Sequence, residues 1–295
     1  MKRGLVIGGL GLLAAIGGVL AFTSPPRLLS WYDRVAGGTE GARLVAEGVA
    51  FGSHGQSLDI WAPEDAAAAG PLPVVIFWYG GGWAKGDRAS YAFAGRALAR
   101  EGFLVVIPDY RKVPEVRFPA FLDDGAEAAA WVEDNIAQHG GDPGRVAVMG
   151  HSAGGYQAVM LALDAKRLAA AGVAPGFIKA GVGLSGPYDF YPFTSERAID
   201  AMSQWPHPEE TQPITFARAD APPLLLVTSD GDETVRVKNA RNLAARLREQ
   251  GALADMINYG PLTHEEVVMA LSVPFRDKGP VLADSVRFLH RQLGK

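Results

Sequence analysis

The chain has 295 residues, of which 48% are hydrophobic and 20% charged, which is enough for one large α/β domain and excludes global disorder. The net charge is −4 and there is no long basic run, so the composition gives no indication of a nucleic-acid partner. There is no cysteine, which excludes disulfides, thiolate nucleophiles and zinc sites built on cysteine.

The N-terminus has the pattern of an export signal. Two basic residues precede Gly4–Phe22, a run without a single charge. Cleaved signal peptides and uncleaved signal anchors both begin this way. Because the basic residues stay in the cytoplasm, we expect residues 1–22 to carry the rest of the chain outward. The protein would then be membrane-anchored and face the periplasm or cell exterior, or be secreted after cleavage. We favour the anchor, followed by a linker over residues 23–43 and one domain over residues 44–295.

The domain shows an alternation of strand and helix signals. Its first signal is a hairpin, in which Leu44–Phe51 and Leu58–Trp61 flank the turn Gly52-Ser-His-Gly55. Further strands are predicted at residues 74–78, 103–107, 145–149, 178–184, 223–228 and 254–259. Helices are predicted at residues 91–101, 119–139, 154–168, 237–250 and 281–293. Continuous apolar strands separated by helices indicate an α/β fold, with a mostly parallel central sheet covered on both faces.

One stretch indicates nucleophilic chemistry. The apolar strand at residues 145–149 leads into Gly150-His-Ser-Ala-Gly154, and a helix of small residues follows. A Gly-x-Ser-x-Gly turn between a strand and a helix holds its serine in a strained conformation, with the hydroxyl exposed at the end of the sheet. Ser152 is therefore the candidate nucleophile.

A second glycine motif predicts a site for a negatively charged oxygen. Tyr79-Gly-Gly-Gly-Trp83 follows the strand at residues 74–78 directly. Consecutive glycines let the backbone turn several N–H groups into one cavity, where they stabilise an oxyanion. The expected donors are the N–H groups of Gly81 and Gly82, together with that of Ala153 after the nucleophile.

The general base should be a histidine that follows the serine in the chain. His264 lies in a loop directly after the last predicted strand, whereas His290 lies within the last helix. We therefore expect His264 to be the base. His151 is adjacent to the nucleophile, cannot readily reach around the turn, and is expected to pack.

The acid that orients the base should follow the strand at residues 223–228. The loop after this strand offers Asp230, Asp232 and Glu233. We favour Asp232, which begins an Asp-x-x-Val run, and expect Glu233 to face solvent. Asp230 stays open as an alternative because aspartate at the start of such a loop is also a turn former. Asp189 is a more remote alternative.

Together these motifs resemble the hormone-sensitive-lipase-like and carboxylesterase-type α/β hydrolases, from about residue 58 to the C-terminus. The matching segments are Tyr79-Gly-Gly-Gly-Trp83, Asp109-Tyr-Arg111, Pro114-Glu115, Phe118-Pro119-Ala120, Asp123-Asp124, Gly140-Gly-Asp-Pro143, Gly150-His-Ser-Ala-Gly154, Asp232-x-x-Val235 and His264. The resemblance implies an α/β-hydrolase fold over residues 44–295, a triad of Ser152, Asp232 and His264, and an oxyanion hole at Gly81, Gly82 and Ala153.

Three features around these motifs need separate expectations. Tyr79 stands where this family has a histidine that braces the glycine loop, and its hydroxyl could serve the same purpose. Asp109 and Arg111 are expected to form a local ion pair. Residues 188–221 are the candidate for a small lid, because the family's long N-terminal cap has no counterpart here.

The expected function is hydrolysis of small to medium acyl esters through an acyl-enzyme, with no cofactor and no metal. An arylformamidase-like amide hydrolase would use the same groups and stays open. A non-catalytic, membrane-tethered binding module on the same fold is the alternative from another functional class.

Overall fold

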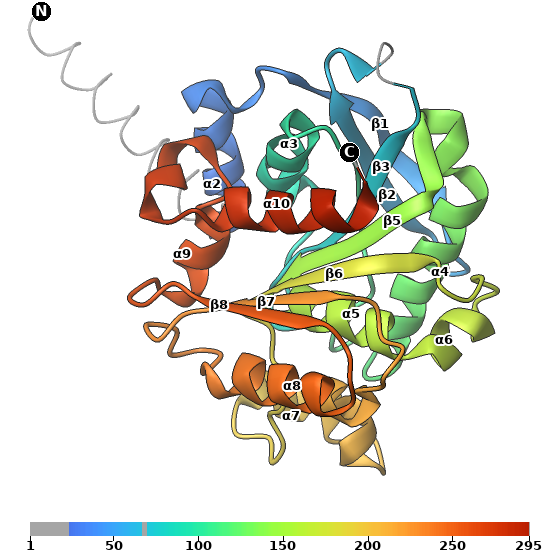
Figure 1. Ribbon diagram of the computed structural model, residues 1–295, viewed down its shortest axis with the longest axis vertical. Coiled ribbons are helices and arrows are strands. Elements are labelled where there is room, and N and C mark those ends of the chain that lie inside the picture. Colours follow the sequence, from blue (N-terminus) through green and yellow to red (C-terminus); the bar gives the residue numbers. More distant parts are fainter. Residues whose placement is uncertain (1–23, 67–69, 295) are drawn as a thin grey trace, which may run out of the picture.

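The computed structural model describes residues 24–66 and 70–294 (Figure 1). The predicted export segment at residues 1–22 lies outside these residues. None of the helices in the described ranges is both long enough and apolar enough to span a bilayer.

The centre of the molecule is an eight-stranded sheet, in the spatial order β1-β2-β4-β3-β5-β6-β7-β8. Its strands are β1 (Ala42–Phe51), β2 (Gln56–Pro63), β3 (Leu72–Trp78), β4 (Leu104–Pro108), β5 (Gly141–His151), β6 (Ile178–Leu184), β7 (Leu224–Thr228) and β8 (Ala254–Asn258). The strands from β4 to β8 along this order pair in parallel, while β2 is antiparallel to both of its neighbours. The predicted hairpin and the mostly parallel sheet are therefore confirmed.

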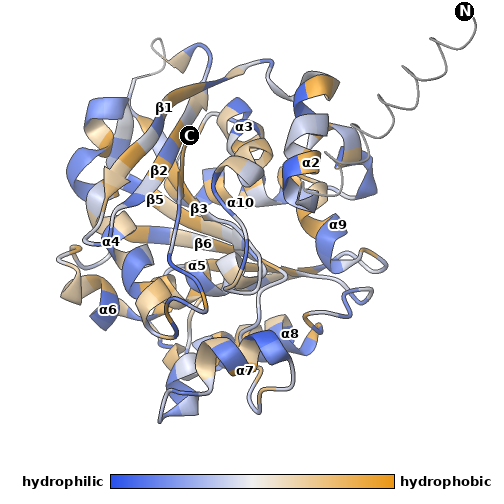
Figure 2. Cartoon of the chain, turned by 180° about the vertical axis from the view of Figure 1, so that it is seen from behind, coloured by the Kyte–Doolittle hydropathy of each residue, from blue (hydrophilic) through white to orange (hydrophobic). Residues whose placement is uncertain are grey.

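Helices cover both faces of the sheet. The helices α3 (Ala92–Arg100) and α10 (Val281–Leu293) pack on one face. The other face carries α4 (Ala120–Asn135), α5 (Ala153–Leu163) and α8 (Lys238–Glu249). Every residue of β3 and β4 is buried, as expected for strands covered on both sides. Hydrophobic residues accordingly concentrate in the central strands, whereas α8 carries hydrophilic stretches (Figure 2).

The segment predicted as a linker differs from the prediction. Residues 25–33 form the helix α2 (Pro25–Asp33), and the π-helical turn η1 (Arg34–Gly38) follows it. Asp33 is fully buried and accepts hydrogen bonds from the Arg96 guanidinium of α3, with the closer nitrogen at 2.7 Å. Its second carboxylate oxygen accepts the backbone N–H of Val273 at 2.8 Å. The helix α2 is therefore part of the domain, held by partners far away in the sequence.

Residues 188–221, which we predicted to form a small lid, lie in the connection between β6 and β7. It holds the short helix α7 (Glu196–Met202) and two 3-10 turns, η5 (Pro208–Thr211) and η6 (Pro213–Phe216). Part of it is anchored in the core, since Tyr188 is fully buried and the Tyr156 hydroxyl donates to the carbonyl of Thr211 at 2.9 Å. Phe190 and Arg197 of this connection line a cavity at the carboxyl end of the sheet.

Candidate active site

Ser152 stands at the tip of a sharp turn between β5 and α5. Its backbone has φ 55° and ψ −122°, a conformation that residues other than glycine rarely adopt. The flanking glycines are required by close approach of the backbone. A Cβ at Gly150 would lie 2.2 Å from the carbonyl oxygen of Gly154, and one at Gly154 would lie 2.1 Å from that of Trp78.

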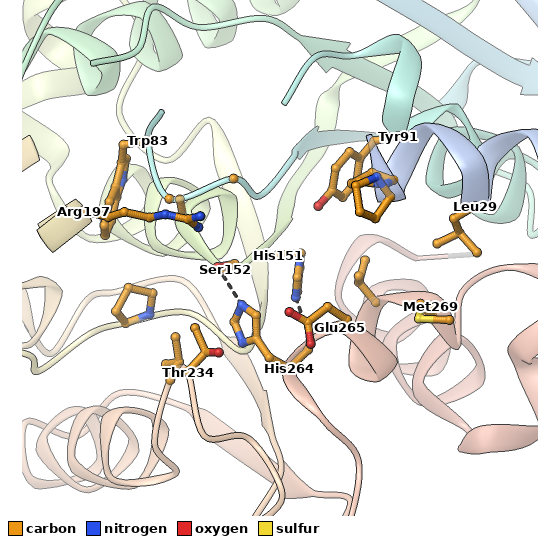
Figure 3. A pocket seen from close by; sticks show the side chains of 18 of the residues that line it. Leu29, Trp83, Tyr91, His151, Ser152, Arg197, Thr234, His264, Glu265 and Met269 are labelled. Carbon is orange, nitrogen blue, oxygen red and sulfur yellow. Dashed lines mark hydrogen bonds between the residues drawn. The ribbon is translucent and has the colours of Figure 1, made fainter. Parts of the chain in front are cut away.

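His264 is the first residue of α9 (His264–Met269), a helix that the sequence did not lead us to expect. Thr263 and Glu266 form a capping box, which fixes where this helix begins. The Nε2 atom of His264 lies 2.8 Å from Ser152 Oγ, and its Nδ1 lies 2.8 Å from Asp232 Oδ2 (Figure 3 draws the serine contact). Both contacts are satisfied when Nδ1–H donates to Asp232 and Nε2 accepts from the serine hydroxyl.

The carboxylate of Asp232 is buried and held by the backbone of its own loop. Its Oδ1 atom accepts the N–H groups of Thr234 at 2.9 Å and Val235 at 2.7 Å. Burial opposes ionisation, but the hydrogen bond and the charge of His264, with the Val235 N–H, outweigh it and lower the pKa of Asp232. A negative charge is thereby maintained beside the imidazole.

The alternative acids lie elsewhere. Asp230 is exposed, and its N–H donates to the side chain of Asn258 at 3.1 Å. The Asp189 carboxylate accepts the side-chain N–H of Asn242 at 2.6 Å. The structure thus brings Asp232 to His264 and leaves the other two aspartates apart from it. Glu233 is exposed, as expected.

The glycine loop lies beside Ser152. Gly81 and Gly82 have φ angles of 137° and 60°, and a Cβ at Gly81 would lie 2.1 Å from the carbonyl oxygen of Lys85. Both glycines and Ala153 line the cavity around Ser152. Within the described part of the chain, the backbone N–H groups of Gly81, Gly82 and Ala153 have no hydrogen-bond acceptor. These donors are free to bind an oxygen in the cavity.

Tyr79 braces this loop through its side chain. Its hydroxyl donates to Asp109 at 2.8 Å and accepts from the Lys112 ammonium at 3.0 Å. The ring stacks on Tyr110, with the centroids 4.7 Å apart. Burial, followed by the charges of Tyr110 and Asp109, raises the Tyr79 pKa well above its ordinary value, so the hydroxyl stays protonated.

The predicted ion pair between Asp109 and Arg111 is wrong. Asp109 instead pairs with the guanidinium of Arg88, while Arg111 pairs with Asp124 on α4 at 2.6 Å. Asp109 also accepts the backbone N–H of Arg88 at 3.0 Å, and the backbone N–H of Arg111 donates to Asp124 at 2.7 Å, so each residue is held by a different segment of the chain.

His151 has a role that sequence reasoning assigned only to packing. Its Nε2–H donates to the backbone carbonyl of His264 at 3.0 Å. Burial, and then the charge of His264, lowers its pKa to about 3, so the ring is neutral. Its Nδ1 atom has no hydrogen-bond partner among the described residues. His151 therefore ties the nucleophile turn to the start of α9.

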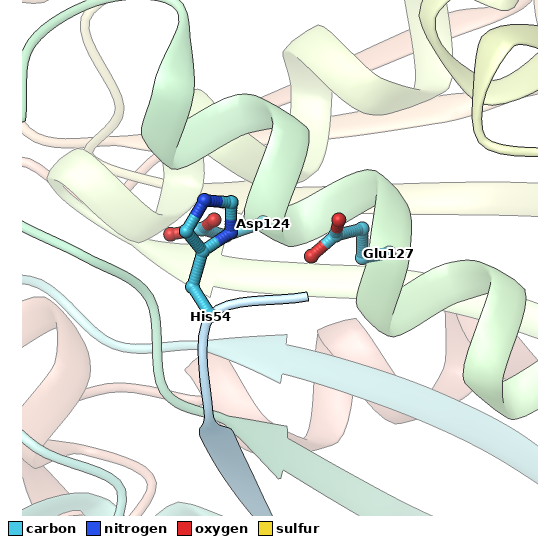
Figure 4. Close-up of side chains that lie close together, drawn as sticks. All are labelled: His54, Asp124 and Glu127. Atoms are coloured by element: carbon cyan, nitrogen blue, oxygen red, sulfur yellow. The ribbon is translucent and has the colours of Figure 1, made fainter. Parts of the chain in front are cut away.

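A second cluster of polar side chains lies away from this cavity (Figure 4). His54, Asp124 and Glu127 offer ligand atoms within 4.8 Å of one another. Each group already has a protein partner: Asp124 is paired with Arg111, and Ser53 contacts both His54 and Glu127. These contacts account for the cluster as a structural network.

The fold and this arrangement define the class of protein. A mostly parallel sheet carries a serine turn after β5, an aspartate after β7 and a histidine after β8, which is the order of the α/β hydrolases. The BD-FAE family model matches residues 58–247, and the chain belongs to this family.

Curated relatives include Esterase LipC of Mycobacterium tuberculosis, which is 34% identical over 212 residues, or 65% of this chain and 52% of the relative. The probable carboxylic ester hydrolase LipM of the same organism is 30% identical over 268 residues, covering 82% of this chain and 58% of the relative. Isoprenylcysteine alpha-carbonyl methylesterase ICME of Arabidopsis thaliana is 26% identical over 276 residues, covering 85% of this chain and 63% of the relative. The match thus spans between half and two thirds of the length of these relatives.

Solved structures share the fold. The thermostable carboxylesterase EstE1, cloned from a metagenomic library, superposes with a TM-score of 0.74 at 21% identity, covering 92% of this chain and 99% of that one. A truncated carbohydrate esterase from gut microbiota gives a TM-score of 0.72 at 20% identity, and the match covers 86% of this chain and 96% of that one.

Proposed function

We propose that this protein hydrolyses carboxylic esters through an acyl-enzyme formed on Ser152. The observation that carries the proposal is the unbroken hydrogen-bond chain from Ser152 through His264 to Asp232, each link 2.8 Å long, at the wall of a cavity. A serine hydroxyl becomes a nucleophile when an oriented base can take its proton. The curated relatives named as esterases support the same reaction.

The arrangement assigns a role to each group. Ser152 attacks the ester carbonyl while Nε2 of His264 takes its proton. Asp232 orients the ring and stabilises its charged form. The N–H groups of Gly81, Gly82 and Ala153 bind the oxyanion, and the protonated His264 then donates to the leaving alcohol. Water activated by His264 hydrolyses the acyl-enzyme, so no cofactor enters the cycle.

The test is a panel of p-nitrophenyl esters and one arylformamide, assayed with the wild type and with Ser152→Ala. We expect ester hydrolysis by the wild type and a loss of kcat on the order of 10⁴ or more in the variant. Activity that survives the substitution would refute the mechanism. Turnover of the arylformamide in preference to every ester would assign the chain to amides, and no turnover at all would favour a binding module.

The assignment of the acid is tested by two matched substitutions. Asp232→Asn removes the charge and the acceptor beside Nδ1 of His264, and we expect kcat to fall on the order of 10³ to 10⁴. Asp230→Asn changes a carboxylate two residues away that faces solvent, and we expect it to leave kcat within about twofold. The opposite ranking would give the role to Asp230.

We also propose that residues 1–22 export the domain and tether it to the membrane, facing the periplasm or cell exterior. The basic start and the uncharged run that follows support this proposal. A fusion to alkaline phosphatase, which is active only outside the cytoplasm, should be active and should stay with membranes after alkaline carbonate extraction. An inactive fusion would refute export, and full release with a shortened N-terminus would show cleavage.

A further inference from the structure

The cavity around Ser152 extends to two sides. Its volume is about 1030 Å³, at the upper end of the range of ligand pockets. Figure 3 shows Leu29, Tyr91 and Met269 on one side of Ser152 and Trp83 and Arg197 on the other. We call the first side the α2 arm. Its walls come from α2, from α9 and from the 3-10 helix η7 (Val273–Lys278), and include Pro25, Leu28, Leu29, Val268, Met269 and Phe275.

The α2 arm is lined mainly by apolar side chains. The side chains that define it are aliphatic, aromatic, proline or methionine, and Tyr91 and Phe93 also line the cavity. One charged residue, Glu265 of α9, also lines the cavity, and it lies beside His264 where the arm meets the catalytic residues (Figure 3). An apolar wall gives water few hydrogen bonds, so transfer of a hydrocarbon chain into the arm is favourable.

The arm is formed before a ligand enters, because its outer wall is fixed. Asp33 at the end of α2 accepts from Arg96 and from the Val273 N–H, which joins α2 to α3 and to η7. Tyr32 packs edge-on against Phe275, with the ring centroids 5.9 Å apart. A preformed wall removes most of the ordering cost that a mobile segment would have on binding.

We propose that the α2 arm binds the hydrocarbon chain of the substrate, and that the preferred substrates are esters with a chain of several methylene groups. The inference rests on the proposed ester hydrolysis at Ser152, since the arm is continuous with that residue. Recognition comes from the apolar surface that the chain and the arm remove from water together. The arm does not require a charge on the substrate.

The first experiment measures kcat/KM for p-nitrophenyl acetate, butyrate, octanoate and decanoate, and for ethyl, butyl and octyl acetate. Complete burial of one methylene group changes binding by about fourfold, so we expect kcat/KM to rise about two- to fourfold for each methylene until the arm is full. A rise with the acyl chain places the acyl group in the arm, and a rise with the alkyl chain places the alcohol there. A flat or falling series with both would overturn the inference.

The second experiment fills the arm. Leu29→Trp places a larger side chain at a residue that lines the arm, and we expect it to lower kcat/KM at least tenfold for the favoured long chain. Ethyl acetate, whose acyl and alkyl chains are both too short to extend into the arm, should lose at least tenfold less in kcat/KM than the long-chain ester. The matched control is Leu253→Trp, at an exposed residue that does not line the cavity, which should leave the whole series unchanged.

The outcomes separate this inference from the proposed function. Suppose that the wild type hydrolyses acetate esters, but Leu29→Trp lowers kcat/KM equally for short-chain and long-chain esters, or for neither. Ester hydrolysis then stands, and the role of the arm is overturned. If no ester is turned over, the arm is tested by measuring whether decanoate binds to the Ser152→Ala variant. Binding that Leu29→Trp weakens on that background would support the arm, and no binding would overturn it.

Discussion

Ser152 is held in a backbone conformation that costs free energy, because its Cβ is crowded at φ 55° and ψ −122°. Strain of this kind persists at functional sites when the surrounding structure enforces it. Here the enforcing contacts are the close approaches at Gly150 and Gly154.

A pair of substitutions measures this strain. Ser152→Ala and Ser152→Gly both remove the hydroxyl, but only glycine relieves the crowding at Cβ. We expect Ser152→Gly to have a free energy of unfolding about 1 kcal/mol higher than Ser152→Ala, because relief of about 1–3 kcal/mol is partly offset by the entropy of glycine in the unfolded chain. Urea unfolding of the two inactive variants gives the difference, and equal stabilities would argue against strain.

His151 should make stability depend on pH. Its pKa is lowered from 6.5 to about 3 in the folded protein, so between these values the unfolded chain binds the extra proton. Stability is therefore lost as pH falls from about 6.5 toward 3. Each pH unit below 6.5 lowers the free energy of unfolding by roughly 1.4 kcal/mol, so at pH 4 the protein is less stable by about 3 kcal/mol than at pH 7.

The measurement is the free energy of unfolding at pH 7 and at pH 4. His151→Asn should lose about 3 kcal/mol less than the wild type over this interval. Leu253→Asn, which changes an exposed residue and exchanges no titratable group, should keep the wild-type pH dependence. A variant at position 151 that follows the wild-type curve would show that burial of this ring does not control the pH dependence.

The site could be predicted from sequence where chain order and local motifs define it. Ser152 and His264 follow from the glycine turn and from the loop after the last strand, and the structure joins them in one hydrogen-bond chain. Asp230 and Asp232 could not be separated by pattern alone, because the choice depends on which carboxylate the loop buries. The contact of His151 with the His264 carbonyl spans 113 positions and leaves no local signal.

At the scale of elements, one buried ion pair, between Asp33 and Arg96, joins α2 to α3. Removing one partner of a buried pair leaves an uncompensated charge, which costs about 3–5 kcal/mol. Asp33→Asn keeps the shape of the side chain and leaves Arg96 without its counter-charge, so we expect a loss of that size in thermal or urea unfolding. Asp200→Asn breaks the exposed pair with Arg117 and should cost less than about 1 kcal/mol. Equal effects would contradict the structural role of Asp33.

Long apolar strands and amphipathic helices were predicted correctly, because burial on both faces leaves a continuous apolar run in the sequence. The short helices α2, α7 and α9 were not. Such helices are stabilised chiefly by tertiary partners, not by propensity. A local signal did exist for α9, since Thr263 and Glu266 have the spacing of a capping box.

At the scale of the whole molecule, the described part of the domain includes α2, so the domain extends at least as far as residue 25 and does not start at residue 44. A chain that starts at Ser24 retains every described contact of α2, and we expect it to hydrolyse p-nitrophenyl acetate at close to the full-length rate. A chain that starts at Ala42 loses the Asp33–Arg96 pair and should be less stable by at least about 3 kcal/mol. Equal melting temperatures of the two shortened chains would contradict this boundary.

The cavity is built from opposite ends of the sequence, since α2 near the start meets α9 and η7 near the end. During synthesis the turn at Ser152 emerges long before His264, and the Val273 N–H that completes the setting of Asp33 comes later still. A nascent or prematurely terminated chain therefore carries a serine without its base and half of a hydrocarbon-binding wall. The proposed activity should accordingly appear only after the segment with His264 and Val273 has been synthesised and has packed against Ser152 and α2.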